Sequence, residues 1–189
     1  MTAPDVVTEM FAAYRTSLDS LEGKLGSAFS HAVDLLEGMS GTVVVCGMGK
    51  SGLVGAKITA TLTSTGTPSV FLHPAEAMHG DLGIVRKGDV VILISNSGET
   101  EEITRLLPAL KRLAVRIIAL VGNVDSTMAR AADICLDAAI DKEACPLNLA
   151  PTTSTLAALV LGDALRCADG EKGVPAGRLC RDSSWWQVG

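Results

Sequence analysis

Short apolar runs alternate with stretches of helical periodicity along most of this chain. The apolar runs predict strands over residues 42–46, 69–72, 89–94, 116–121 and 134–136. Apolar residues three or four positions apart predict helices over residues 51–64, 101–113, 127–132 and 153–168. Strands that alternate with helices form βαβ units, and their parallel sheet carries helices on both faces. The fold class is therefore a three-layer α/β/α sandwich with a five-stranded parallel sheet.

The composition fits such a sheet and narrows the classes of function. Hydrophobic residues make up 48% of the 189 residues but aromatic residues only 3%, so Val, Leu, Ile and Ala must build the core. The net charge of −5 argues against a nucleic-acid partner, and no apolar stretch is long enough to span a membrane. Five scattered cysteines and an N-terminus without a signal-peptide pattern lead us to expect a cytoplasmic protein with reduced thiols.

The two ends of the chain differ from its middle. Residues 6–37 carry apolar side chains at helical spacing, which predicts one long N-terminal helix. We expect that helix and the alternating segments to form one domain over residues 1–168. Residues 169–189 contain four glycines and little periodicity, so we expect an irregular C-terminal tail.

The first of two glycine-bearing turns, CGMGKSG, follows an apolar run, and ligands of parallel sheets bind at such strand ends. It is not a P-loop, because Val44 occupies the position of the required first glycine. Its spacing Gly47-x-Gly49-x-x-Gly52 matches the dinucleotide fingerprint. The next predicted strand ends in FLHPAEA, however, without the acidic residue that would hold a ribose. A nucleotide-binding oxidoreductase domain therefore rests on glycine spacing alone.

The second turn, SNSGET at residues 95–100, offers three hydroxyls around a glycine just before a predicted helix. Exposed backbone N–H groups and the positive end of a helix suit a phosphate group. The alternative is that Ser97 or Thr100 merely caps that helix. Glu101 and Glu102 lie in its first turn, where acidic residues are common because they interact favourably with the helix dipole.

A long connection between the last predicted strand and the last helix contains Glu143. Long loops inside compact domains are often functional, although a solvated acidic residue is the plainer interpretation. Thr152, Thr153 and Ser154 open the last helix, and we interpret them as helix caps in preference to ligand contacts.

Four stretches together resemble the sugar isomerase (SIS) domain of arabinose 5-phosphate isomerases. They are GMGKSGLVGAKITATLTSTGTPSVFLHPAEAMHGDLGIV, ISNSGETEEI, MARAADICL and KEACPLNLAPTTSTLAALVLGDAL. The resemblance covers residues 43–165, and HPAEAMHGDLG and KEACPLNLAPT point to this subfamily. It implies a flavodoxin-like fold and a cytoplasmic homotetramer. It also implies interconversion of D-arabinose 5-phosphate and D-ribulose 5-phosphate, on the route to the lipopolysaccharide sugar Kdo.

The resemblance also implies site residues. Lys50, Glu102 and Glu143 match residues implicated in catalysis. The reaction moves a proton between C1 and C2 through an enediol, which requires a base, a donor for the carbonyl oxygen and an anchor for the phosphate. We expect Glu102 or Glu143 to be the base, since burial can raise a glutamate pKa toward neutrality, and Lys50 to stabilise the enediolate or hold phosphate. The expected substrate-binding residues are Gly49, Ser51, Gly66, Thr67, His73, His79, Ser95, Ser97 and Thr100.

The reaction requires no redox cofactor, but His73 also matches a position where inhibitory zinc binds. His73 and His79 flank PAEAM in one predicted loop, and a complete zinc site requires further ligands. Contact with a sugar, or hydrogen bonding within the loop, is the alternative role for both histidines.

The resemblance ends near the C-terminus. The family's last helix usually leads into SHPGG, whose histidine is implicated in ring opening or proton transfer, but this sequence has no histidine after His79. Many members also carry two CBS domains, which we do not find here. The main alternative to an enzyme is therefore a non-catalytic phosphosugar-binding module or regulator.

Overall fold

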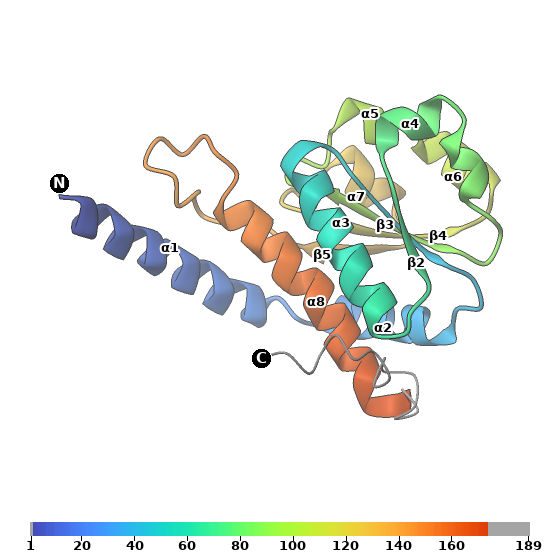
Figure 1. The fold of residues 1–189 in the computed structure, drawn as a ribbon, viewed down its shortest axis with the longest axis horizontal. Helices are drawn as coiled ribbons and strands as arrows, with labels where there is room; N and C mark the ends of the chain where they lie inside the picture. Colours follow the sequence, from blue (N-terminus) through green and yellow to red (C-terminus); the bar gives the residue numbers. More distant parts are fainter. Residues whose placement is uncertain (1, 174–189) are drawn as a thin grey trace, which may run out of the picture.

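A computed structural model describes residues 2–173 of the chain, with side chains through residue 166. The five strands form one parallel sheet in the order β2-β1-β3-β4-β5 (Figure 1). Their bounds are β1 Val43–Gly47, β2 Ser69–Leu72, β3 Val90–Ser95, β4 Arg116–Val121 and β5 Ile134–Asp137. This strand order is that of flavodoxin-like folds, so the predicted fold class is confirmed.

Helices cover both faces of the sheet (Figure 1). The first face carries α2 (Ser27–Gly38), α3 (Gly49–Ser64) and α8 (Thr153–Gly173). The second face carries α4 (Pro74–Met78), the 3-10 helix η1 (Asp81–Ile84), α5 (Glu101–Thr104), α6 (Leu107–Arg112) and α7 (Thr127–Ala131).

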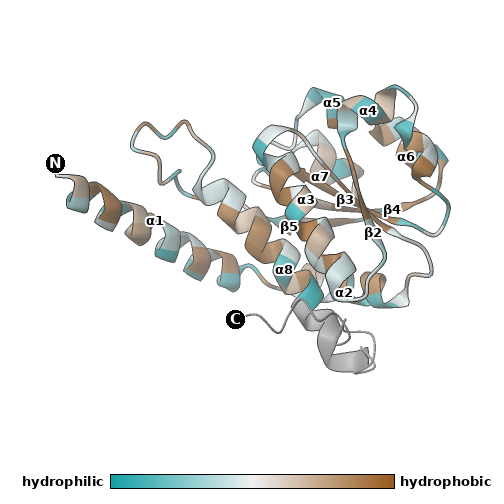
Figure 2. Ribbon diagram, viewed as in Figure 1, coloured by the Kyte–Doolittle hydropathy of each residue, from teal (hydrophilic) through white to brown (hydrophobic). Residues whose placement is uncertain are grey.

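The strands are buried because both faces of the sheet are covered. Every residue of β1 and β3 is buried. Along β3, Ile92 and Ile94 pack into the core under α3 and α8, whereas Val91 and Leu93 pack into the core on the opposite face. Figure 2 shows the strands as mostly hydrophobic and the covering helices as mixed in character. Aliphatic side chains thus form two cores, as the composition predicts.

The prediction of a single N-terminal helix over residues 6–37 is wrong. The chain forms α1 (Ala3–Gly23) and then α2, with Gly26 preceding the second helix. Glycine weakens a helix at this position, and a tertiary contact fixes the break. Lys24 Nζ lies 3.3 Å from the Asp137 carboxylate at the end of β5 and bonds the adjacent loop backbone. Before the break, α1 lies beside α8 (Figure 1).

Two further helix boundaries differ from the prediction. The helix predicted over residues 101–113 is divided into α5 and α6, because Pro108 has no N–H to donate to the Thr104 carbonyl. Helix α8 continues to Gly173, so the first five residues of the predicted irregular tail are helical. The remainder of that tail, residues 174–189, lies outside the described residues.

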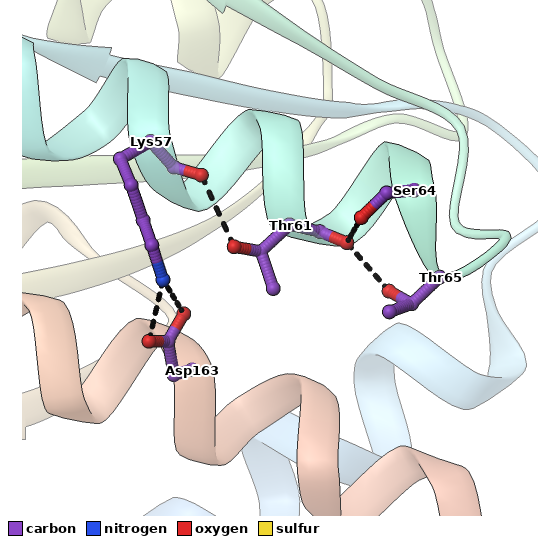
Figure 3. Close-up of polar contacts among 5 residues, drawn as sticks. All are labelled: Lys57, Thr61, Ser64, Thr65 and Asp163. Atoms are coloured by element: carbon purple, nitrogen blue, oxygen red, sulfur yellow. Dashed lines mark hydrogen bonds and ion pairs between the residues drawn. The ribbon is translucent and has the colours of Figure 1, made fainter. Parts of the chain in front are cut away.

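Helices α3 and α8 pack closely. Lys57 Nζ bonds both carboxylate oxygens of Asp163 at 2.8 and 2.6 Å (Figure 3). These side chains are 49% and 36% exposed, so the pair contributes at most about 1 kcal/mol. Packing contributes more at Gly162, where an added Cβ would lie 2.3 Å from Cδ1 of the fully buried Ile58.

We therefore predict that Gly162→Val lowers the free energy of unfolding by about 1–3 kcal/mol, because Ile58 has no space to move away. Urea unfolding followed by circular dichroism measures this change. The matched control is Gly23→Val, since nothing lies within 4 Å of a Cβ built there. Equal losses in the two variants would show that close packing of α3 on α8 is not the cause.

Candidate functional site

A cavity of about 550 Å³ opens at the carboxyl ends of β1 and β3. The chain passes from β1 toward one edge of the sheet and from β3 toward the other, so the cavity lies where the strand order reverses. Ligands of open α/β sheets bind at such a position. The lining residues are Met48, Lys50, Ser51, Ser95, Asn96, Ser97, Thr100, Ile140, Asp141, Lys142, Glu143, Asn148, Leu149, Pro151 and Ser154.

The cavity brings together predicted site residues from three separate segments. Lys50 and Ser51 come from the first turn of α3, and Glu143 comes from the connection between β5 and α8. Ser95, Ser97 and Thr100 come from residues 95–100, which we call the hydroxyl loop. Gly49 begins α3 with φ +57°, a conformation that glycine adopts without strain, and lies beside the lining residues.

The other predicted site residues do not line this cavity. Gly66 and Thr67 connect the end of α3 to the start of β2, at the amino ends of the strands, whereas the cavity lies at their carboxyl ends. Glu102 is partly buried in the first turn of α5. His73 and His79 flank α4. Contact between any of these residues and a substrate stays a prediction.

His73 has an unusual environment for a metal ligand. Its Nδ1 atom is buried and lacks a hydrogen-bond partner within the described part of the chain. No group of three or more His, Cys, Asp or Glu side chains comes together there either. A zinc site at His73 thus lacks a set of three protein ligands among the described residues, and zinc binding stays a prediction.

The hydroxyl loop holds its side chains through a compact network. Ser95 Oγ lies 2.7 Å from Thr100 Oγ1 and 3.4 Å from Ser97 Oγ. It also accepts the Gly98 N–H at 3.0 Å. Thr100 precedes α5 but its side chain accepts no capping hydrogen bond, and Ser97 Oγ accepts from Glu99, outside the helix. The alternative that these hydroxyls merely cap α5 is therefore wrong.

Glu143 is bonded to the start of α8. Its Oε2 accepts the N–H groups of Thr152 at 2.7 Å and Ser154 at 3.2 Å, and the Ser154 hydroxyl bonds Oε1. Partial burial raises the pKa of Glu143, but the hydrogen bonds from Ser154 and Thr152 outweigh burial and hold that pKa below its ordinary value of 4.5. The expectation of a base whose pKa is raised by burial is thus wrong for Glu143 in this arrangement.

The hydroxyls at the start of α8 bond the preceding loop. Thr152 Oγ1 donates to Glu143 at 3.1 Å and accepts the Ala144 N–H at 3.0 Å, and Thr153 Oγ1 accepts the same N–H at 2.9 Å. Their interpretation as simple helix caps is incomplete, because they fix residues 143–145 against α8. Glu143 supplies the carboxylate that caps the helix from outside it.

Four polar residues of the cavity were not predicted, namely Asn96, Asp141, Lys142 and Asn148. Asn96 and Lys142 are direct neighbours of predicted site residues in the sequence, so each motif read as a whole would have included them. Asn148 is less visible, because its role depends on a left-handed backbone with φ +52° and on an Oδ1 that accepts the Glu143 N–H at 2.7 Å.

Two lysines of the cavity are available to an anion, and the carboxylates of Asp141 and Glu143 also line it. Lys50 and Lys142 line it, and neither forms an ion pair with another residue in the described part of the chain. The Glu143 carboxylate is already satisfied by donors of α8. The N-terminus of α3 adds backbone N–H groups and the positive end of a helix dipole.

Comparison with known proteins identifies the family to which this chain belongs. The SIS domain family matches residues 39–168. The chain belongs to the SIS domain family. It is 58% identical over 154 residues to arabinose 5-phosphate isomerase KdsD of Pseudomonas aeruginosa, and 55% identical over 160 residues to KdsD of Escherichia coli K12. These matches cover 82% and 85% of this chain but 47% and 49% of the relatives, so the chain spans about half their length.

This chain is also similar in structure to a solved protein. The E. coli CFT073 protein c3406, in complex with arabinose 5-phosphate, is 40% identical to this chain and superposes with a TM-score of 0.85. The match covers 90% of this chain and 93% of that one. Within the described residues, no helix is both long enough and apolar enough to cross a membrane.

The Glu143 network gives a pH-dependent prediction. A carboxyl with a lowered pKa stabilises the fold above its unfolded value of 4.5, and this stabilisation is lost as pH falls through the lower folded pKa. We expect Glu143→Ala to lower the free energy of unfolding by about 1–2 kcal/mol at pH 7, as for loss of a helix cap. The difference from wild type should shrink below pH 4.5. Urea unfolding at several pH values measures it, and a difference that is independent of pH would contradict an ionised cap.

Proposed function

We propose that this chain is an aldose–ketose isomerase that interconverts D-arabinose 5-phosphate and D-ribulose 5-phosphate. The observation that carries the proposal is the cavity itself, which brings the hydroxyl loop together with Lys50 and Glu143 at the point of strand-order reversal. The similarity of its SIS domain to arabinose 5-phosphate isomerases and to a protein in complex with arabinose 5-phosphate supports the same substrate.

In this proposal the phosphate group binds at the hydroxyl loop. Ser95, Ser97 and Thr100 supply hydroxyl donors within one cluster, and Ser51 adds another from the first turn of α3. The helix dipole of α3 favours a dianion at its N-terminus. An anchored phosphate leaves C1 and C2 of the open-chain sugar to reach the Lys50 and Glu143 side of the cavity.

Isomerisation then requires a proton to leave C2 and return at C1. Glu143 is ionised at neutral pH, because hydrogen bonds hold its pKa below 4.5, and it can therefore accept a proton. The Lys50 ammonium group would stabilise the negative charge that develops on the enediolate oxygen. One proton moves from C2 to C1 and another from the C2 hydroxyl to the C1 oxygen, with no net oxidation or reduction, so the proposed reaction needs no redox cofactor.

The proposal also includes a homotetramer in the cytoplasm. Gly66, Thr67, Glu102 and His79 lie outside the cavity of their own chain. A neighbouring copy would have to bring them to a substrate bound there, if they act as the family resemblance implies. Glu102 is then a second candidate for the base, supplied in trans.

A non-catalytic phosphosugar binder is the second candidate function. Two observations favour it: the sequence has no histidine after His79, and the Glu143 carboxylate is occupied by donors of α8. Such a protein would keep the phosphate anchor and lack turnover.

The deciding experiment mixes the purified chain with D-arabinose 5-phosphate and follows ribulose 5-phosphate by NMR. We expect both turnover and saturable binding. Saturable binding without turnover would replace the isomerase with the binding module. An absence of both would contradict a phosphosugar site altogether.

Lys50 gives a test of the mechanism. We expect Lys50→Ala to lower kcat by about 10²–10³-fold, because it removes an electrostatic donor from the developing oxyanion. Lys57→Ala is the matched control, since Lys57 lies on the same helix and pairs with Asp163 away from the cavity. Steady-state kinetics on D-arabinose 5-phosphate, with circular dichroism of each variant, measures the effect. Wild-type kcat in Lys50→Ala would remove Lys50 from the mechanism.

A further inference from the structure

The hydroxyl loop has a second side, which faces away from the cavity and contacts the start of α7. Glu99 Oε1 accepts the Thr127 N–H at 2.6 Å, and the Gly98 carbonyl accepts the Met128 N–H at 3.1 Å. Two consecutive backbone donors from the first turn of α7 are thus bonded to the loop. Short helices begin with free N–H groups, so each partner gains a hydrogen bond that it would otherwise make only with water.

The loop and α7 are also in close steric contact. Gly98 has φ +67°, and a Cβ built on it would lie only 2.0 Å from Ser126 Oγ. Ser126 is fully buried and its Oγ accepts the Ala129 N–H, so it cannot move aside. At the other end of the loop, the Asn96 carbonyl accepts the Gly122 N–H at 2.9 Å. The segments that follow β4 therefore fix the hydroxyl loop on its side away from the cavity.

Glu99 links this contact to the hydroxyls. Its own N–H donates to Ser97 Oγ at 3.2 Å, and the next residue is Thr100, whose Oγ1 bonds Ser95. Glu99 does not line the cavity, and its carboxylate points toward α7. A side chain in this position acts on a ligand only by holding the donors that touch it.

We propose that Glu99 is a positioning residue for the phosphate anchor: its bond to the Thr127 N–H holds the hydroxyl loop in the geometry that binds phosphate. The inference rests on the proposed function, because it takes the hydroxyl loop to be the phosphate site. Donors that are already in place lose less entropy when a ligand binds, so loosening the loop should weaken binding more than turnover.

Glu101 provides a matched control two residues away. Its carboxylate forms an ion pair with Arg105 at the end of α5 and is 70% exposed, and Glu101 is not among the residues that line the cavity. Glu99 and Glu101 thus share charge, exposed position and sequence neighbourhood, and differ in the partner of the carboxylate.

The experiment compares wild type with Glu99→Ala, Glu99→Gln and Glu101→Ala. Binding of inorganic phosphate is measured by NMR titration, and kcat and KM are measured with D-arabinose 5-phosphate. For Glu99→Ala we expect the Kd for phosphate and the KM for the sugar phosphate to rise roughly three- to tenfold, the effect of one lost hydrogen bond, with kcat changed by less than about twofold. Glu99→Gln should restore wild-type values, because its amide oxygen accepts the same N–H. Glu101→Ala should match wild type.

The other possible results would overturn either the inference alone or the proposed function as well. Unchanged Kd and KM in Glu99→Ala, or an equal loss in Glu101→Ala, would overturn the inference and leave the proposed function intact. A loss of kcat alone would also overturn it, since it would place Glu99 in the chemical step. A wild-type chain that neither binds phosphate nor converts D-arabinose 5-phosphate would overturn the proposed function, and the inference with it. Amide exchange of residues 97–101 adds a readout of the loop, and it should accelerate only in Glu99→Ala.

Discussion

The pairing of β1 with β3 is the constraint on which the site depends. Gly47 lies beside Ile94 at the end of this ladder, so the turn that begins α3 and the hydroxyl loop emerge next to each other. The chain then leaves in opposite directions, α3 over one face of the sheet and α5 over the other, which opens the cavity between them. Two polar turns that are far apart in sequence become one site because the apolar runs that precede them are buried as neighbouring strands.

In the proposed mechanism, Glu143 combines a structural and a chemical role. It caps α8, fixes the connection after β5, and is one of two acidic residues that line the cavity, with Asp141. Its donors lower its pKa, which keeps it ionised but makes it a weaker base. A bound sugar that draws away the Ser154 hydroxyl would weaken that stabilisation and raise the basicity of Glu143. The capped arrangement is therefore the resting form of the site in the proposed mechanism.

Local features of the sequence predicted the sheet well. Continuous Val, Ile and Leu runs are buried on both sides, so β4 and the core positions of β3 followed from the pattern alone. Helix breaks were harder, because the end of α1 depends on Lys24 reaching Asp137, more than one hundred residues away in the sequence. For the site, hydroxyl and lysine motifs identified the cavity wall. The partners of Glu143 and the backbone of Asn148 depend on how a loop folds back on α8, which no spacing rule encodes.

The most direct test of this account is a crystal structure of the chain with D-arabinose 5-phosphate bound. We predict that the phosphate oxygens lie within hydrogen-bond distance of the Ser95, Ser97 and Thr100 hydroxyls, with C1 and C2 of the sugar between Lys50 and Glu143. A sugar phosphate bound elsewhere, with the cavity at the ends of β1 and β3 empty, would contradict it.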